Sequence, residues 1–157
     1  QEPLNALVQP EIKVPFSLFI PESYIDGQGT RLAMYRRISK IHSENEMVAV
    51  ESEMAERFGP IPKEVRELLW MVRLRNLLSA HRVTHLTLGP QAMSMQFDAH
   101  HKIDPSKLVS LLSSNPKKYQ ISAQQKLVVN CLEAGGFLAG NMQELTFLVE
   151  TLLHKLS

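Results

Sequence analysis

Apolar and polar residues alternate near the start of the chain. Every second residue is apolar at Ile12, Val14, Phe16 and Leu18. A strict two-residue period is typical of a β-strand with one buried face. Pro15 has no backbone N–H to donate, so we expect this strand to lie at the edge of a sheet.

The following part of the chain has a three- to four-residue period, which predicts amphipathic helices. We place three of them at residues 30–42, 44–58 and 62–82. Their apolar residues recur at helical spacing: Leu32, Tyr35, Ile38 and Ile41, then Met47, Val50, Met54 and Phe58, then Val65, Leu68, Leu69 and Val72. Gly59 suits the end of the second helix, and Pro62 suits the first position of the third. The short connections predict antiparallel neighbours.

After residue 82 the pattern returns to short alternating runs. The segments 86–88 and 93–97, with Gly89-Pro90 between them, predict a β-hairpin. Asp104-Pro105 and Asn115-Pro116 predict the start and the end of a short helix. Residues 119–122 and 127–132 predict two further strands.

The last segment has the widest apolar helical face of the chain. Asn141 can cap this helix, and Glu144 three residues later nearly completes a capping box. The apolar face comprises Leu145, Leu148, Val149, Leu152, Leu153 and Leu156. We interpret this face as the one that covers the sheet.

Together these elements predict an α+β fold: a three-helix segment, a small antiparallel sheet in ββαββ order and a C-terminal amphipathic helix. We expect a single domain over residues 1–157, with the edge strand and three helices in 11–82 and the remaining elements in 83–157. Because the chain begins with Gln1 and not Met, we expect it to be a piece of a larger multidomain protein.

The charge balance argues against a dedicated nucleic-acid-binding domain. The chain has 17 Lys and Arg residues against 16 Asp and Glu residues, a formal net charge of +1. Its single cysteine, Cys131, excludes an intramolecular disulfide and fits a reducing compartment. No apolar run is long enough to span a bilayer and no secretory signal precedes the helices, so we expect a cytoplasmic monomer.

We find no combination of residues that predicts catalysis, a cofactor site or a metal site. Gly135 and Gly140 have the spacing of a P-loop, but the Lys-Ser/Thr pair that binds phosphate and magnesium does not follow. His100-His101 lacks the further ligands of a zinc motif. Ser114 and Lys117 enclose a proline, where the catalytic Ser-x-x-Lys motif needs a helix.

The charges of the first two predicted helices have opposite signs. The first carries Arg31, Arg36, Arg37 and Lys40, and the second carries Glu44, Glu46, Glu51, Glu53 and Glu56 before Arg57. These charges could stabilise the helix hairpin by attraction between its two helices, or they could simply form a solvated face. Alternatively, Glu53, Glu56 and Arg57, which lie off the apolar stripe, form a partner-binding surface.

Three segments resemble the C-terminal module of the bacterial transcription-repair coupling factor. They are Ile20–Asp26 (IPESYID), Arg31–Ile38 (RLAMYRRI) and Glu53–Pro62 (EMAERFGPIP). The resemblance is specific over about residues 11–82 and looser beyond. The sequence departs from the family pattern in having Met54 for the usual Leu and Glu56 for the usual Asp.

The resemblance implies a non-catalytic regulatory module of an ATP-driven double-stranded-DNA translocase. In this family the parent displaces stalled RNA polymerase and recruits UvrA for transcription-coupled nucleotide excision repair. ATP and Mg would bind in the parent's motor domains, and no cofactor in this chain. The module would dock on the parent's UvrA-binding module and mask it until the motor engages polymerase. Carried over by position, the contacting residues would be Glu53, Glu56 and Arg57.

A competing hypothesis is a nucleic-acid contact through the basic helix Arg31–Lys40. Phosphate contacts by these cations would weaken steeply with salt. The acidic neighbouring helix and the net charge of +1 argue against this hypothesis.

Overall fold

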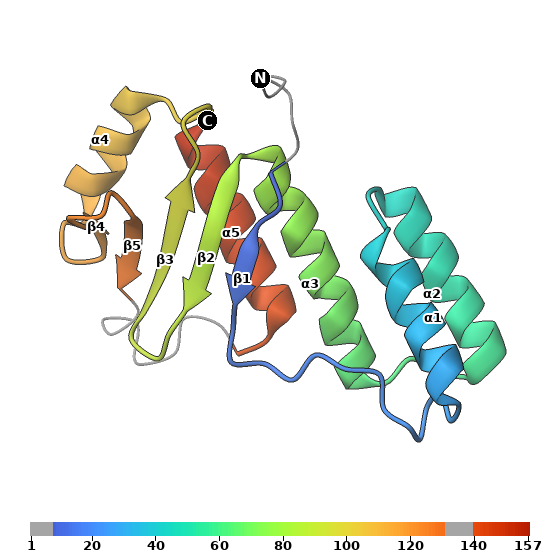
Figure 1. Cartoon of the computed structure of the whole chain (residues 1–157). Coiled ribbons are helices and arrows are strands. Elements are labelled where there is room, and N and C mark those ends of the chain that lie inside the picture. Colours follow the sequence, from blue (N-terminus) through green and yellow to red (C-terminus); the bar gives the residue numbers. More distant parts are fainter. Residues whose placement is uncertain (1–7, 131–139) are drawn as a thin grey trace. The chain divides into compact units, whose positions relative to one another are not determined.

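The computed structural model describes residues 8–130 and 140–157, and these residues form five helices and five strands (Figure 1). The α+β class is therefore confirmed. Contacts divide the chain into two compact units. We call Phe16–Asn76 the helical unit, and Gln1–Pro15 with Leu77–Ser157 the sheet unit. The prediction that residues 1–157 form a single domain stays a prediction.

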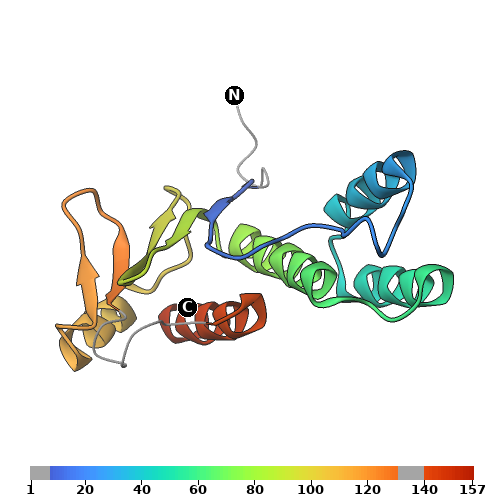
Figure 2. The same ribbon diagram turned by 90° about the horizontal axis from the view of Figure 1, so that it is seen from below.

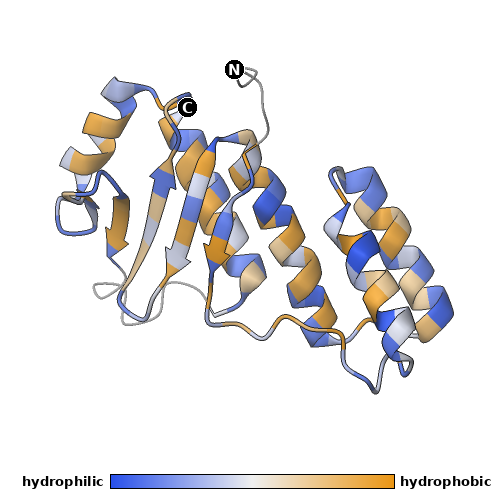
Figure 3. Cartoon of the chain, viewed as in Figure 1, coloured by the Kyte–Doolittle hydropathy of each residue, from blue (hydrophilic) through white to orange (hydrophobic). Residues whose placement is uncertain are grey.

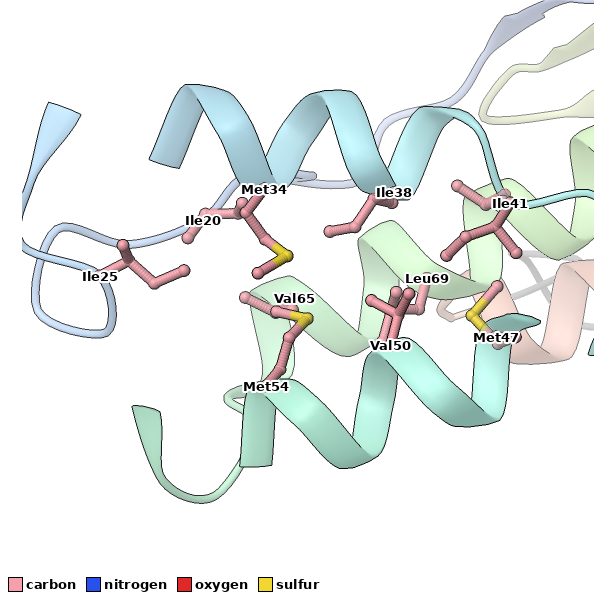
Figure 4. Close-up of a cluster of buried hydrophobic side chains, with 11 residues drawn as sticks. Ile20, Ile25, Met34, Ile38, Ile41, Met47, Val50, Met54, Val65 and Leu69 are labelled. Carbon is pink, nitrogen blue, oxygen red and sulfur yellow. The ribbon is translucent and has the colours of Figure 1, made fainter. Parts of the chain in front are cut away.

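The helical unit contains α1 (Gln28–Ser39), α2 (Glu44–Phe58) and most of α3 (Lys63–Ala80). The bounds of α2 agree with those predicted, because Ser43 caps its start and Gly59 follows its end. The helix predicted over residues 30–42 begins earlier and ends at Ser39. α1 and α2 run antiparallel, and α3 returns antiparallel to α2, as expected from the short connections (Figure 4).

The core of the helical unit is a cluster of Met, Ile, Val and Leu side chains drawn from all three helices and the preceding loop (Figure 4). Its members include Met34 and Ile38 of α1, Met54 of α2, and Leu69 of α3. The prediction that Leu32 faces the core is wrong, since its side chain is 49% exposed. At 100° per residue Leu32 lies on the opposite side of α1 from Met34, which occupies the core position instead.

The end of α2 depends on a backbone conformation that glycine tolerates best. Gly59 has φ 92° and ψ −171°, a region that side chains with a Cβ rarely adopt. The Tyr24 hydroxyl donates to the carbonyl oxygens of Gly59 at 2.9 Å and Met54 at 3.2 Å. The loop before α1 is thereby tied to the last turn of α2.

The sheet unit contains a five-stranded sheet in the order β1-β2-β3-β5-β4. The strands are β1 (Glu11–Lys13), β2 (Val83–Leu88), β3 (Ala92–Phe97), β4 (Tyr119–Ile121) and β5 (Leu127–Asn130). The predicted antiparallel sheet is confirmed for these four strands: β2 pairs with β3, β3 with β5 and β5 with β4, all antiparallel. β1 pairs parallel to β2, so the whole sheet is mixed. A parallel pair needs a crossover connection, which the three helices supply.

The first strand lies at the sheet edge, as Pro15 predicted, but it is shorter than expected. The alternating run over residues 12–18 pairs with β2 only as far as Lys13. Pro10 and Pro15 flank the strand, and neither can donate a backbone hydrogen bond to a ladder.

One face of the sheet is covered by α4 (Pro105–Ser114) and α5 (Met142–Leu156) (Figures 1 and 2). The predicted caps are confirmed: Asp104 accepts from Ser106 N at 2.9 Å, and Asn141 accepts from Glu144 N at 2.9 Å. Leu145 is fully buried, whereas Leu148 is 40% exposed, so the prediction that Leu148 faces the core is wrong. It lies at the margin of the apolar face, where the covering layer ends.

The junction between α3 and β2 is held by a bidentate ion pair. Arg82 Nε and Nη2 donate to the two carboxylate oxygens of Asp98 at 2.9 and 2.6 Å, and Asp98 N donates to the Arg82 carbonyl at 2.9 Å. Hydrogen bonds from Arg82 hold the pKa of Asp98 at about 2. Arg82 itself has a left-handed φ of 58°, which a residue ending a helix commonly adopts.

Candidate docking surface

The three candidate partner-binding residues lie on α2, whose start is well defined by hydrogen bonds. The Ser43 hydroxyl accepts from Glu46 N at 3.1 Å, and Glu46 Oε2 accepts from His42 N at 3.0 Å. Met47, Val50 and Met54 face the core. Figure 3 shows both hydrophilic and hydrophobic segments along α1 and α2, as amphipathic helices require.

The flank of α2 toward α3 is an ion-pair network. Arg73 donates to Glu44 through Nε at 3.2 Å and Nη2 at 2.9 Å, and to Glu51 at 2.7 Å. The hydrogen bonds from Arg73 lower the pKa of Glu44. These two carboxylates therefore serve the packing of α2 against α3. The spacing of charges along the sequence does not predict this role of Arg73.

The flank of α2 toward α1 carries Glu53, which binds two arginines through one oxygen. Glu53 Oε2 accepts from Arg37 of α1 and, at 3.0 Å, from Arg57 of α2. Hydrogen bonds from Arg37 and then Arg57 lower the pKa of Glu53. The opposite charges of α1 and α2 thus meet across the hairpin, as the first of the three sequence-based interpretations expected.

Arg57 and Glu56 differ in how far the helical unit uses them. Arg57 is half exposed, pairs with Glu53 and has its guanidinium carbon 4.7 Å from the centre of the Phe58 ring. Glu56 is exposed, and its carboxylate makes no hydrogen bond or ion pair with any residue in 8–130 and 140–157. The structure therefore brings Glu53 and Arg57 together and leaves Glu56 directed to solvent. Their role in binding a partner stays a prediction.

Two of the four cations of the basic helix are committed to contacts inside the helical unit. Arg31 is largely buried and donates to the carbonyl oxygens of Ile25 at 2.9 Å and Asp26 at 2.8 Å. Arg37 binds Glu53. The side chains of Arg36 and Lys40 are exposed and, in the described part of the chain, make no ion pair. The basic helix thus offers two available cations, one turn apart.

The remaining sequence candidates gain no support as chemical sites. Among the described residues, no group of three or more His, Cys, Asp or Glu side chains could hold a metal ion. The Ser114 hydroxyl donates to the Leu111 carbonyl at 2.6 Å, a contact within the end of α4. Cys131 and Gly135 lie outside the described residues. Within the described ranges, no helix has the length and apolar character needed to cross a membrane.

Comparison with known proteins gives a consistent family. The transcription-repair-coupling factor of Borreliella burgdorferi is 31% identical over 106 residues, which are 68% of this chain and 9% of that protein. The protein of the same name from Escherichia coli is 28% identical over 119 residues, which are 76% of this chain and 10% of that protein. This chain therefore spans about a tenth of the length of the curated relatives it matches.

A solved structure shares the fold. The crystal structure of the C-terminal domain of transcription-repair coupling factor matches with a TM-score of 0.73 and 19% identity, covering 95% of this chain and 94% of that one. The family model of the TRCF domain matches residues 14–108, which include the whole helical unit and the β2–β3 hairpin. The resemblance carried by residues 20–62 is thus confirmed, and the chain belongs to the TRCF domain family.

Proposed function

We propose that this chain is a non-catalytic regulatory module of a transcription-repair coupling factor. It docks through α2 on the UvrA-binding module of the same parent and masks it. The mask is released when the parent, an ATP-dependent DNA translocase, engages stalled RNA polymerase. Glu56 and Arg57 contact the partner module directly, and Glu53 orients Arg57.

The observation that carries this proposal is the unused charge on the outer side of α2. Glu44 and Glu51 bind Arg73, and Glu53 binds Arg37 and Arg57, whereas Glu56 binds none of the described residues. An exposed carboxylate that contributes nothing to its own fold is free to pair with a cation of a partner. Arg57 has five N–H donors and spends one on Glu53, so it retains donors for a partner carboxylate.

Such a surface suits a contact that must open. Interfaces between domains of one chain are modest in area and more polar than obligate interfaces. Arg–carboxylate pairs give such a contact orientation and specificity more than net stability. If the translocating parent favours an undocked arrangement, binding of polymerase and exposure of the UvrA-binding module are linked by one coupling free energy.

The test is UvrA binding by the full-length parent without polymerase. Glu56→Arg would place a cation against the partner cation, so we expect the docked state to lose about 2 kcal/mol or more. UvrA affinity should rise accordingly, and Arg57→Glu should act in the same direction. Titration calorimetry measures the affinity, and thermal melting of the 157-residue chain checks that each variant folds.

Glu150→Arg is the matched control, since Glu150 is an exposed glutamate on α5 of the sheet unit. It makes the same change of charge away from α2 and should leave UvrA affinity unchanged. Normal melting together with unchanged UvrA affinity for both Glu56→Arg and Arg57→Glu would show that this side of α2 is a solvated surface, and the proposal would be wrong.

A nucleic-acid contact receives less support from the same residues. With Arg31 and Arg37 engaged, Arg36 of α1 and Lys40 just after its end are the cations of the basic segment that remain for phosphate. Two phosphate contacts predict a shallow salt dependence, with a slope of about −2 in log–log form. A salt titration of DNA binding that gave a markedly steeper slope would favour this second function.

A further inference from the structure

A groove of about 330 Å³ opens on the surface of the helical unit, between the end of α1 and the first half of α2. Six residues line it: Arg37, Lys40, Ile41, Glu46, Ala49 and Val50. We call it the α1–α2 groove. All six residues belong to the helical unit.

The groove has an apolar floor and a charged rim. Ile41 and Val50 reach it from the core, where they are 2% and 5% exposed. Ala49 is exposed, and its single methyl group leaves the space open. On the rim, Glu46 Oε2 already accepts from His42 N, whereas the Lys40 ammonium group has no ion pair among the described residues. The side chains that contribute most to binding fill pockets of this kind on the partner, so an apolar depression with one unpaired cation at its edge is suited to receive such a side chain.

The groove is continuous with the proposed docking surface. Arg37 lines the groove and also binds Glu53, the carboxylate that holds Arg57. Along α2, the groove residues Glu46 and Ala49 lie one to two turns before Glu53. A partner that covers Glu56 and Arg57 would therefore reach the groove with the same surface.

We infer that the α1–α2 groove receives an apolar side chain of the parent's UvrA-binding module, next to an acidic residue of that module that pairs with Lys40. This inference rests on the proposed function and adds an apolar anchor to it. The charge of Lys40 selects an acidic neighbour, and the groove of about 330 Å³ has room for an apolar side chain. The partner comes from the same parent because this chain spans about a tenth of its relatives' length, which leaves most of such a protein to supply it.

The test fills the groove in the full-length parent and measures UvrA affinity without polymerase. Ala49→Met adds an apolar side chain where the partner's should lie, and methionine is a good helix former. We expect UvrA affinity to rise about tenfold as the masked state is lost, a change of about 1.4 kcal/mol. Ala55→Met is the matched control, since Ala55 is an exposed alanine of α2 that does not line the groove.

A second pair of variants keeps the test decisive if Ala49→Met fails to fold. Lys40→Glu should raise UvrA affinity by repelling the acidic neighbour. Lys63→Glu, at an exposed lysine of α3, makes the same charge change outside the groove and should have no effect. Thermal melting shows which variants fold.

The outcomes separate this inference from the proposed function. If Glu56→Arg raises UvrA affinity but Ala49→Met and Lys40→Glu leave it unchanged, the groove is not an anchor and the proposed function stands. If none of the α2 substitutions changes UvrA affinity, the proposed function fails and the groove inference fails with it. A change in oligomeric state of Ala49→Met by light scattering, with UvrA affinity unchanged, would assign the groove to a second copy and overturn the inference.

Discussion

The helical unit and the sheet unit use their charged residues differently. In the helical unit, charges cross between helices: Arg73 binds Glu44 and Glu51, and Arg37 binds Glu53. In the sheet unit, Arg82 and Asp98 form a bidentate pair that secures one chain junction, and the sheet core is apolar. Most charged side chains at the contacts between these helices are therefore in ion pairs, and the few without one can be identified.

This difference explains why the candidate surface lies on α2. A helix presents a full cylinder, so charges off the core stripe fall on two flanks and an outer side. In α2 the charges on the two flanks form ion pairs with α1 and α3. Glu56 lies on the outer side and takes no part in these ion pairs. The sheet unit buries one face of its sheet under α4 and α5, and among the described residues β2 and β3 carry no comparable row of charges.

The largest effect is expected in the core of the sheet unit. Leu145→Ala removes a fully buried side chain of α5, and the free energy of unfolding should fall by about 2–5 kcal/mol. Leu148→Ala is the matched control on the same helix, where the 40% exposed side chain should cost on the order of 1 kcal/mol. Urea unfolding measures both. Equal losses would mean that α5 does not cover the sheet in the way described.

The helical unit should be sensitive to a change of backbone conformation at the end of α2. Gly59→Ala places a Cβ on a residue with φ 92° and ψ −171°, and we expect a loss of about 1–3 kcal/mol from backbone strain. Space is not the cause, since no atom lies within 4 Å of the added Cβ. Gly29→Ala in α1 is the control: its Cβ also meets nothing, and it should stabilise by about 0.4–1 kcal/mol. A neutral Gly59→Ala would contradict the strain argument.

The ion pair of the sheet unit predicts a pH dependence. The pKa of Asp98 lies at about 2, below its usual 3.8, so its contribution to stability is complete above about pH 4 and is lost as the pH falls toward 2. Asp98→Asn should lower the melting temperature at pH 7 by less than Leu145→Ala does. The difference in melting temperature between Asp98→Asn and the unsubstituted chain should shrink between pH 4 and pH 2. A constant difference across that range would show that the charge of Asp98 is not what stabilises the junction.

The smallest effects compare two glutamates of α2. Glu53→Gln removes the charge that holds Arg37 and Arg57, so the melting temperature should fall slightly at low salt and less at high salt. Glu56→Gln should leave the free energy of unfolding within about 0.5 kcal/mol of that of the unsubstituted chain at any salt concentration. If Glu56→Gln destabilised the chain as much as Glu53→Gln, Glu56 would have a structural role and would no longer be the residue free for a partner.

Periodicity and end signals along the chain were enough to locate most elements. The bounds of α2 follow from Ser43 and Gly59, and α4 begins where Asp104-Pro105 predicts. Caps and turns are local, because the groups that satisfy a helix end come from within a few residues of it. The β2–β3 hairpin is local in the same sense. The apolar pattern misplaced two residues: Leu148 lies at the margin of the apolar face of α5, and Leu32 lies on the side of α1 opposite Met34.

Other features were decided by tertiary structure. Helical spacing alone places Glu53, Glu56 and Arg57 off the core stripe of α2, because a helix turns 100° per residue whatever surrounds it. Spacing does not show that the Glu53 carboxylate binds Arg37 while the Glu56 carboxylate binds no described residue, since that depends on how α1 packs beside α2. Likewise, the parallel pairing of β1 with β2 joins residues about 74 positions apart, and the α1–α2 groove exists only where two helices meet. Local geometry repeats along the chain, whereas a contact between distant segments depends on the packing of the whole unit.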